Sequence, residues 1–133
     1  MRKKRLLDTF AILAWLLNEP HAGQVQALLQ EARQDTSEFF ITLINLGELY
    51  YTLRRGLSVT EVKNLITQLL AVPVTVVPVT EALVWESAEI KARNPLSYAD
   101  CFAVAAARQL GASVITGDRE FKRIEGMVQV EWI

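Results

Sequence analysis

The sequence predicts an α/β protein, a three-layer α/β/α sandwich around a mainly parallel central sheet. Short apolar runs rich in β-branched residues alternate with longer runs in which apolar residues recur at helical spacing. The runs expected to form strands are 5–7, 38–42, 72–78, 112–116 and 128–132. The runs expected to form helices are 10–17, 23–33, 43–55, 60–70, 80–93 and 97–110, with a short helix after 118. Because the 133 residues contain no repeat or linker, we expect one domain, 1–133.

The first half of the chain has clear boundaries between these elements. Asp8 separates the first strand from the first helix, where it is suited to cap the helix N-terminus. Pro20 breaks the chain before the second helix, and Gly56 closes the third. Ser58 and Glu61 have the spacing of a capping box, which predicts the start of the helix 60–70.

The second half is bounded in the same way. Two prolines near the ends of 72–78 favour the edge of the sheet for that strand. Ser97 is a good N-cap for the Ala-rich helix that Gly111 ends. The buried-type strand 112–116 then leads to Asp118, and the alternating run 128–132 predicts a half-exposed strand at the opposite edge.

Composition excludes several classes of protein. The formal net charge of −1, from 14 basic and 15 acidic residues, excludes a chain that attracts nucleic acid through its overall charge. The basic start and the following apolar run imitate a secretory signal, but Asp8 interrupts the run and no small-residue cleavage site follows. A single cysteine, Cys101, fits a reducing compartment. We therefore expect a cytoplasmic protein with no membrane segment.

Four carboxylates are expected at one edge of the sheet, because each stands where a strand or helix meets that edge: Asp8, Glu48, Asp100 and Asp118. Capping of the neighbouring helices explains the aspartates one at a time, but it gives no reason for them to converge. Clustered carboxylates repel one another unless protons or a cation neutralise them. Mg²⁺ and Mn²⁺ prefer oxygen ligands, so we expect one of these ions here.

Metal ions at this edge could activate a water and stabilise the leaving oxygen of a phosphodiester, which is nuclease chemistry. Thr116, two residues before Asp118 on the same face of its strand, is placed to orient a ligand or a water. No Gly-rich fingerprint follows the first strand, which disfavours a nucleotide cofactor. A phosphoacceptor receiver domain shares the architecture but leaves Glu48 and Asp118 unexplained.

The chain resembles the PIN-domain ribonucleases, in particular the VapC-type toxins of VapBC toxin–antitoxin pairs, over essentially its whole length. LLDTFAILAWLLNEP is similar to the opening strand and helix of the family, ITLINLGELYY to its second motif, and the unit from Asp100 to Asp118 to its third and fourth. The four acidic positions of the family pattern fall on Asp8, Glu48, Asp100 and Asp118. One departure is Phe10, where a small polar residue often follows the Asp-Thr pair.

The resemblance implies an Mg²⁺- or Mn²⁺-dependent endoribonuclease that cuts cellular RNA such as tRNA or rRNA. It also implies a cognate VapB-like antitoxin and a homodimer. The apolar helix faces near the N-terminus and at 60–70 would suit both contacts. Basic residues considered for RNA contact are Lys3, Lys4, Arg119, Lys122 and Arg123. The alternatives are a catalytically silent PIN-like module that binds protein or RNA, and an RNA-processing nuclease without an antitoxin.

Overall fold

A parallel sheet forms the centre of the molecule. The computed structural model describes residues 2–133, and within them it contains a five-stranded sheet in the order β3-β2-β1-β4-β5. The strands are β1 (Lys3–Leu7), β2 (Ser37–Thr42), β3 (Val74–Val77), β4 (Ser113–Thr116) and β5 (Val130–Trp132). Every neighbouring pair is parallel. The predicted parallel sheet is confirmed, and the two strands predicted at its edges lie there.

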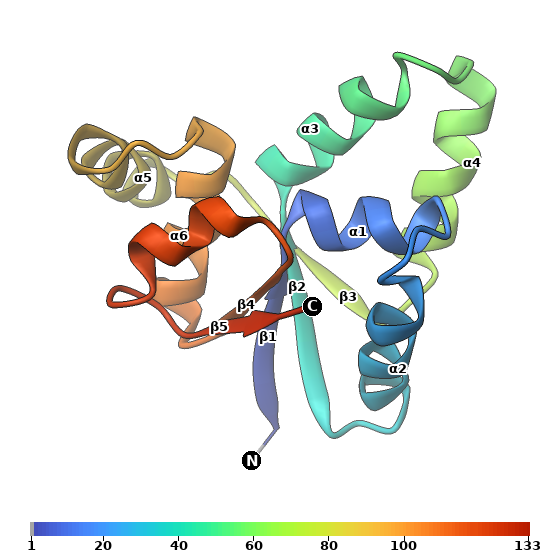
Figure 1. Ribbon diagram of the computed structural model, residues 1–133, viewed down its shortest axis with the longest axis horizontal. Coiled ribbons are helices and arrows are strands. Elements are labelled where there is room, and N and C mark those ends of the chain that lie inside the picture. The colour runs from blue at the N-terminus through green and yellow to red at the C-terminus, as the bar shows by residue number, and fades with distance from the viewer. Residues whose placement is uncertain (1) are drawn as a thin grey trace.

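Helices cover both faces of this sheet, with α5 and α6 to one side of it and α1, α2 and α4 to the other (Figure 1). The helices are α1 (Thr9–Leu16), α2 (Ala22–Arg33), α3 (Leu43–Leu53), α4 (Val59–Leu70), α5 (Glu81–Arg93), α6 (Tyr98–Leu110) and the 3₁₀ helix η1 (Arg119–Ile124). No helix within residues 2–133 has the length and apolar character needed to cross a membrane.

Two hydrophobic cores result from this layering, one on each face. Successive strand side chains point to opposite faces, so Leu6 joins the core with α5 and α6 while Leu7 joins the core with α1 to α4. The run from Cys101 to Ala107 on α6 is entirely buried. Its small side chains let α6 pack closely on β1 and β4, and this fixes the start of α6 at the edge of the sheet.

The capping residues identified in the sequence begin and end these helices. Ser58 and Glu61 make both bonds of a capping box at the start of α4. Ser97 caps α6 by accepting a hydrogen bond from the Asp100 N–H. Gly111 ends α6 in the left-handed conformation, with φ of 68°, which glycine adopts without steric cost.

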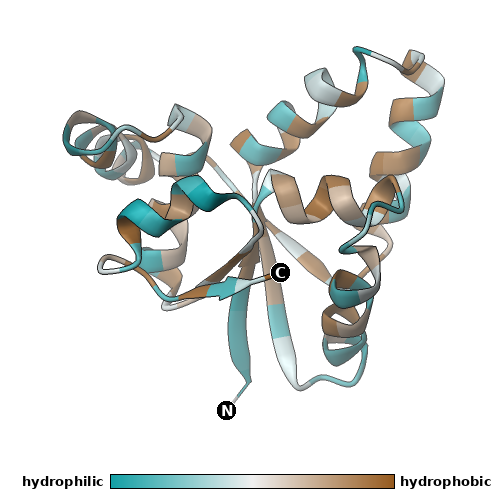
Figure 2. Cartoon of the chain, in the orientation of Figure 1, coloured by the Kyte–Doolittle hydropathy of each residue, from teal (hydrophilic) through white to brown (hydrophobic). Residues whose placement is uncertain are grey.

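β1 is longer than the sequence pattern indicates, because it begins at Lys3 rather than at residue 5. Its first residues pair with β2 through the backbone, Lys3 with Ser37 and Lys4 with Glu38. Their side chains are exposed, so this end of the strand is hydrophilic, as Figure 2 shows. An apolar pattern detects only the buried part of such a strand.

Arg5 is the buried charge at this end of the sheet, with a relative exposure of only 4%. Its guanidinium donates to Glu31 on α2, to Glu131 on β5 at 2.9 Å and to the Ser37 hydroxyl at 3.2 Å. It also lies 5.9 Å from the centre of the Phe39 ring. Arg5 therefore links α2 and β5 to β1, and its buried positive charge is paired with two carboxylates.

We predict that Arg5→Ala destabilises the protein by about 2 kcal/mol, because it leaves two carboxylates without their buried partner. The value stays below that of a fully buried pair because Glu31 and Glu131 are partly exposed. Urea unfolding measures the change. Arg93→Ala is the matched control: it removes an exposed pair with Glu89 and should cost less than about 0.5 kcal/mol. Equal losses for the two variants would contradict this account.

Candidate active site

The candidate site lies where the strand order of the sheet reverses. β1 and β4 are neighbours, and the chain leaves them toward opposite sides of the sheet. Asp8 directly follows β1, and Asp118 stands two residues beyond β4. In open parallel sheets the carboxyl ends of the strands leave a crevice at such a switch point, and this crevice is where ligands bind.

Asp8 is the most buried of the four carboxylates, with 1% of its surface exposed. One of its oxygens, Oδ1, accepts a hydrogen bond from the Ala11 N–H at 2.9 Å and so caps α1. The other, Oδ2, accepts from the Thr116 hydroxyl. Burial raises the pKa of Asp8 from 3.8 to about 7, and the nearby Asp100 and Asp118 carboxylates add to the rise. The carboxyl is therefore held in place but is costly to ionise.

Asp118 is positioned by the same threonine. Its N–H donates to the Thr116 hydroxyl at 2.9 Å, and its Oδ1 accepts from the Glu120 N–H at 3.0 Å, which caps η1. One hydroxyl therefore links the residues that follow β1 and β4. The sequence singled out Thr116 as an orienting residue, and its hydroxyl bonds the Asp8 carboxylate and the Asp118 backbone N–H.

Asp100 lies half-buried in the first turn of α6. Burial raises the pKa of Asp100 to about 6, with further contributions from the Asp118 and Glu48 carboxylates. The Ser97 hydroxyl accepts a hydrogen bond from the Asp100 N–H at 3.2 Å, and hydrogen bonding to the Ser97 side chain lowers the pKa of the Asp100 carboxyl, which opposes the effect of burial. Asp100 therefore takes part in the cap of α6, and it also lines the pocket.

Glu48 comes from α3 and is held by a chain of buried polar groups. The Thr9 hydroxyl donates to Glu48 Oε1 at 2.5 Å and accepts from Asn45 Nδ2 at 3.2 Å. Asn45 Oδ1 in turn accepts from the Thr42 hydroxyl at 2.5 Å. Thr42 and Asn45 are fully buried, so the chain links the end of β2 to the pocket through fixed groups.

All four carboxylates line one pocket of about 530 Å³. Its lining residues are Asp8, Thr9, Phe10, Leu13, Glu48, Thr52, Pro95, Ser97, Asp100, Asp118 and Glu120. The polar side-chain atoms in this lining are all oxygens of carboxylates and hydroxyls. Within residues 2–133, however, no three acidic, histidine or cysteine side chains are already close enough together to hold a metal ion. The carboxylates therefore share a pocket without forming a ready-made cluster among the described residues.

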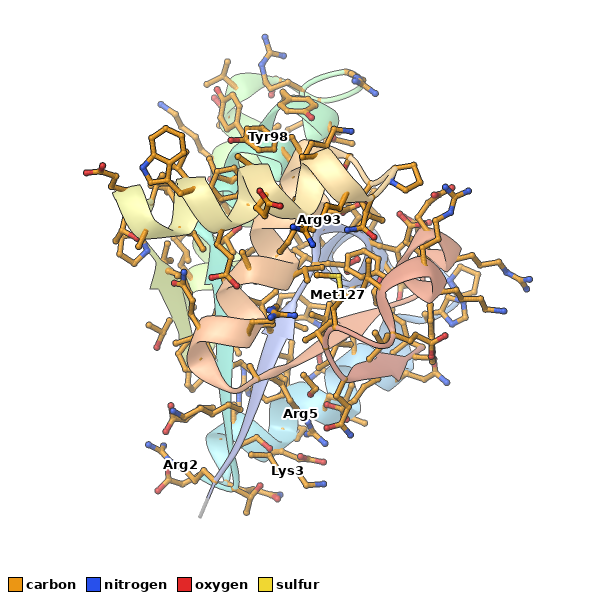
Figure 3. The ribbon with its side chains drawn as sticks, turned by 90° about the vertical axis from the view of Figure 1, so that its left-hand side faces the viewer. Arg2, Lys3, Arg5, Arg93, Tyr98 and Met127 are labelled. Atoms are coloured by element: carbon orange, nitrogen blue, oxygen red, sulfur yellow. The ribbon has the colours of Figure 1, made fainter. Side chains whose placement is uncertain are left out.

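The basic residues suggested for RNA contact divide between two ends of the molecule. Lys3 and Lys4 lie at the start of β1 and line a separate groove of about 790 Å³. Figure 3 shows Lys3 at the lower end of the molecule and Tyr98, which begins α6, at the upper end. These two lysines lie away from the carboxylates, because Asp8 follows the opposite end of the same strand. Arg119, Lys122 and Arg123 lie on η1, directly after Asp118.

A comparison with protein-family models decides the family. The model for the PIN domain matches residues 5–127 of this chain. The chain belongs to the PIN domain family. The match begins within β1 and ends before β5, so it covers β2, β3, β4 and part of β1, and it includes the four carboxylates.

Solved structures share the fold of this PIN domain over almost its whole length. VapBC2 from Rickettsia felis bound to a promoter DNA fragment has a TM-score of 0.81 at 16% identity, covering 97% of this chain and 98% of that one. DNA-bound VapBC from Salmonella typhimurium has a TM-score of 0.78 at 22% identity, covering 99% and 98%. VapC20 from Mycobacterium tuberculosis, described as a sarcin-ricin loop cleaving toxin, has a TM-score of 0.74 at 20% identity, covering 89% of this chain and 92% of that one. No protein of curated function matches the sequence.

Two features of this PIN domain were missed by reasoning from the sequence. Thr9 was taken only as the residue after Asp8, but its hydroxyl holds Glu48. Glu120 was not considered, but it lines the pocket as a fifth carboxylate, with an ion pair to Arg123 at 3.5 Å. The Asp-Thr pair at a strand end was the one available signal for Thr9. No signal in the sequence connects Thr9 with Glu48, 39 residues away.

Proposed function

We propose that this PIN domain is a metal-dependent endoribonuclease in which Asp8, Glu48, Asp100 and Asp118 hold Mg²⁺ or Mn²⁺. The observation that carries the proposal is the pocket itself. Carboxylates from four separate elements, following or flanking three different strands, line one cavity at the switch point of the sheet. Helix capping explains the placement of single aspartates, but not their convergence with Glu48.

The donor set of the pocket suits a hard divalent cation. Carboxylate oxygens are the ligands that Mg²⁺ and Mn²⁺ prefer, and the single cysteine and single histidine are not among the lining residues. Burial, with a further contribution from the neighbouring carboxylates, raises the pKa values of Asp8 and Asp100, and a bound cation would favour their ionised forms. When bound, such ions supply an activated water and charge stabilisation at the leaving oxygen.

The side chains around the carboxylates would keep the pocket in one geometry during the reaction. Thr116 fixes Asp8 and the Asp118 backbone relative to each other. Thr9 fixes Glu48, and Asn45 fixes Thr9. Such supporting hydrogen bonds orient metal ligands and prevent them from turning away. The chain therefore positions four acidic groups for an in-line displacement at phosphorus, for which positioning supplies much of the rate.

We further propose that the protein is the toxin of a VapBC-type pair, acts on cellular RNA such as tRNA or rRNA in the cytoplasm, forms a homodimer and is inhibited by a VapB-like antitoxin. The support is the fold shared with VapBC complexes and with a toxin described as cleaving the sarcin-ricin loop. Exposed apolar side chains on α3 and α4 supply surface for protein contacts: Leu43, Tyr51, Val59 and Leu70.

The nuclease proposal is tested by incubating end-labelled total RNA with the purified, partner-free protein in Mg²⁺, in Mn²⁺ and in a chelator. We expect discrete cleavage products that require either metal. Folded protein that cuts no RNA class with any metal would contradict the proposal and favour a silent PIN-like module that binds protein or RNA.

The toxin proposal is tested by expressing the protein alone and together with the product of a small reading frame immediately upstream of its gene. We expect growth arrest in the first case and rescue in the second, with the two proteins purifying together. A nuclease that needs no such partner, and whose expression leaves growth unchanged, would instead fit RNA processing.

We predict that Thr9→Val lowers the affinity for Mn²⁺ by about 10- to 100-fold, because Glu48 loses the hydroxyl that orients it. Calorimetric titration of Mn²⁺ into the metal-free protein measures the change. The matched control is Thr67→Val, which removes an exposed hydroxyl bonded to the Lys63 carbonyl on α4. Wild-type affinity in Thr9→Val would show that Glu48 needs no support from Thr9.

A further inference from the structure

Phe10 is a large aromatic residue that lies outside both hydrophobic cores. It stands on the first turn of α1, two residues after Asp8, and 39% of its surface is exposed. Phe39 and Phe121, by comparison, are buried to 1% and 0% exposure. Phe10 lines the same pocket as the four carboxylates. An apolar ring kept at the mouth of a charged pocket calls for an explanation other than packing.

The ring of Phe10 lies over Gly117 and beside the His21 ring. A Cβ atom added to Gly117 would lie 2.3 Å from Phe10 Cε1, so the ring occupies the space that any other residue at 117 would fill. The His21 ring flanks it with a centroid distance of 6.4 Å, within the range of aromatic pairs. Phe10 is thus seated between the turn that carries Asp118 and the loop before α2.

We propose that Phe10 is a stacking platform for one nucleobase of single-stranded RNA next to the phosphodiester held at the carboxylates. The inference rests on the proposed nuclease function and deepens it. Aromatic side chains bind unpaired bases through their flat faces, and a base inside a duplex has no free face to offer. Phe10 therefore selects loops and single strands over paired RNA.

The position of the ring favours RNA over a protein side chain as the occupant. Phe10 shares the pocket with Asp8, Asp100 and Asp118, where the scissile phosphate would be held. A base attached to a neighbouring nucleotide would then come within reach of the ring without any movement of the chain. The carboxylates repel the remaining phosphates, so binding through the base offsets a cost that the pocket imposes on its own substrate.

The test uses single-stranded RNAs about ten nucleotides long, a length within the usual range of single-strand sites, in which one nucleotide at a time is made abasic. Binding is followed by fluorescence polarisation in the Asp118→Asn background, so that the RNA stays intact. We expect an abasic nucleotide at one position to weaken binding about tenfold, and Phe10→Leu to weaken binding of the intact RNA by the same factor. Combined, the two changes should weaken binding no further.

Two further variants separate stacking from a general disturbance. Gly117→Ala should weaken binding about tenfold when Phe10 is present, because its Cβ displaces the ring, and should have no effect in Phe10→Ala. Trp85→Leu is the matched control, since it removes another exposed aromatic from α5, outside the pocket. With Asp118 intact and Mg²⁺ present, Phe10→Leu should raise KM about tenfold at unchanged kcat, as expected for uniform binding.

The outcomes distinguish this inference from the proposed function. If the wild-type protein cleaves RNA but Phe10→Leu binds and cleaves like wild type, the stacking role is overturned and the nuclease proposal stands. If the Asp118→Asn protein with Phe10 intact binds no RNA, or if Phe10→Leu loses only antitoxin binding, the stacking role is also overturned. If the folded wild-type protein cleaves no RNA with any metal, the nuclease proposal is rejected, and the inference that rests on it falls too.

Discussion

Asp118→Asn is expected to lower the rate of metal-dependent RNA cleavage by about a thousandfold. An amide keeps one oxygen but carries no charge, so the pocket loses part of the negative field that holds a cation. A bound ion contributes several kcal/mol to the stabilisation of the transition state, and each 1.36 kcal/mol corresponds to a factor of ten in rate. Single-turnover cleavage of an RNA that the wild-type protein cuts measures the change.

The fold should survive this substitution, because Asn is also a good N-cap and can accept the Glu120 N–H that now bonds Asp118. Asp35→Asn is the matched control. It replaces an exposed aspartate that pairs with Arg2 near the start of β1, at the other end of the molecule from the pocket. Comparable activity in Asp118→Asn and Asp35→Asn, with circular dichroism unchanged, would remove Asp118 from the mechanism.

Asp8→Asn is expected to make the metal-free protein more stable at alkaline pH, although it should also inactivate it. The pKa of Asp8 is raised from 3.8 to about 7, mainly by burial, so the folded protein binds a proton more tightly than the unfolded chain does. Its contribution to stability is complete below pH 3.8 and is lost as the pH rises through about 7. An asparagine cannot ionise and avoids this loss.

The stabilisation by Asp8→Asn should therefore be larger at about pH 8 than at about pH 5, by on the order of 2 kcal/mol. Urea unfolding in the presence of a chelator gives both values. Asp100→Asn should follow in the same direction, since the pKa of Asp100 is raised to about 6. Asp35→Asn again serves as the control. A gain that does not depend on pH, or a loss that grows with pH, would contradict a buried Asp8 that resists ionisation.

The layers of the fold could be predicted because their causes are local. Ser58, Ser97 and Gly111 mark helix ends through bonds made within a few residues. The prolines beside β3 exclude a central position, and the alternation in β5 indicates a half-exposed edge. The start of β1 could not be found in this way, since the exposed side chains of Lys3 and Lys4 carry no apolar signal. Only pairing with β2 shows that these residues are in the strand.

The candidate site could also be predicted from the sequence in part. Carboxylates that follow parallel strands must come to one edge, so the approach of Asp8 and Asp118 could be expected from strand boundaries alone. The contacts that hold the pocket together are not local. Thr9 with Glu48, Thr116 with Asp8 and the Phe10 ring on Gly117 join residues that are far apart in the chain. No spacing rule connects such residues before the topology is known.

The most direct measurement for the central claim is the anomalous scattering of Mn²⁺ in crystals of the partner-free protein, recorded at the manganese edge. The account predicts a manganese peak in the pocket, within coordination distance of carboxylate oxygens from Asp8 and at least one of Glu48, Asp100 and Asp118. A fully soaked crystal with no peak there, or with manganese only in the groove beside Lys3 and Lys4, would contradict it.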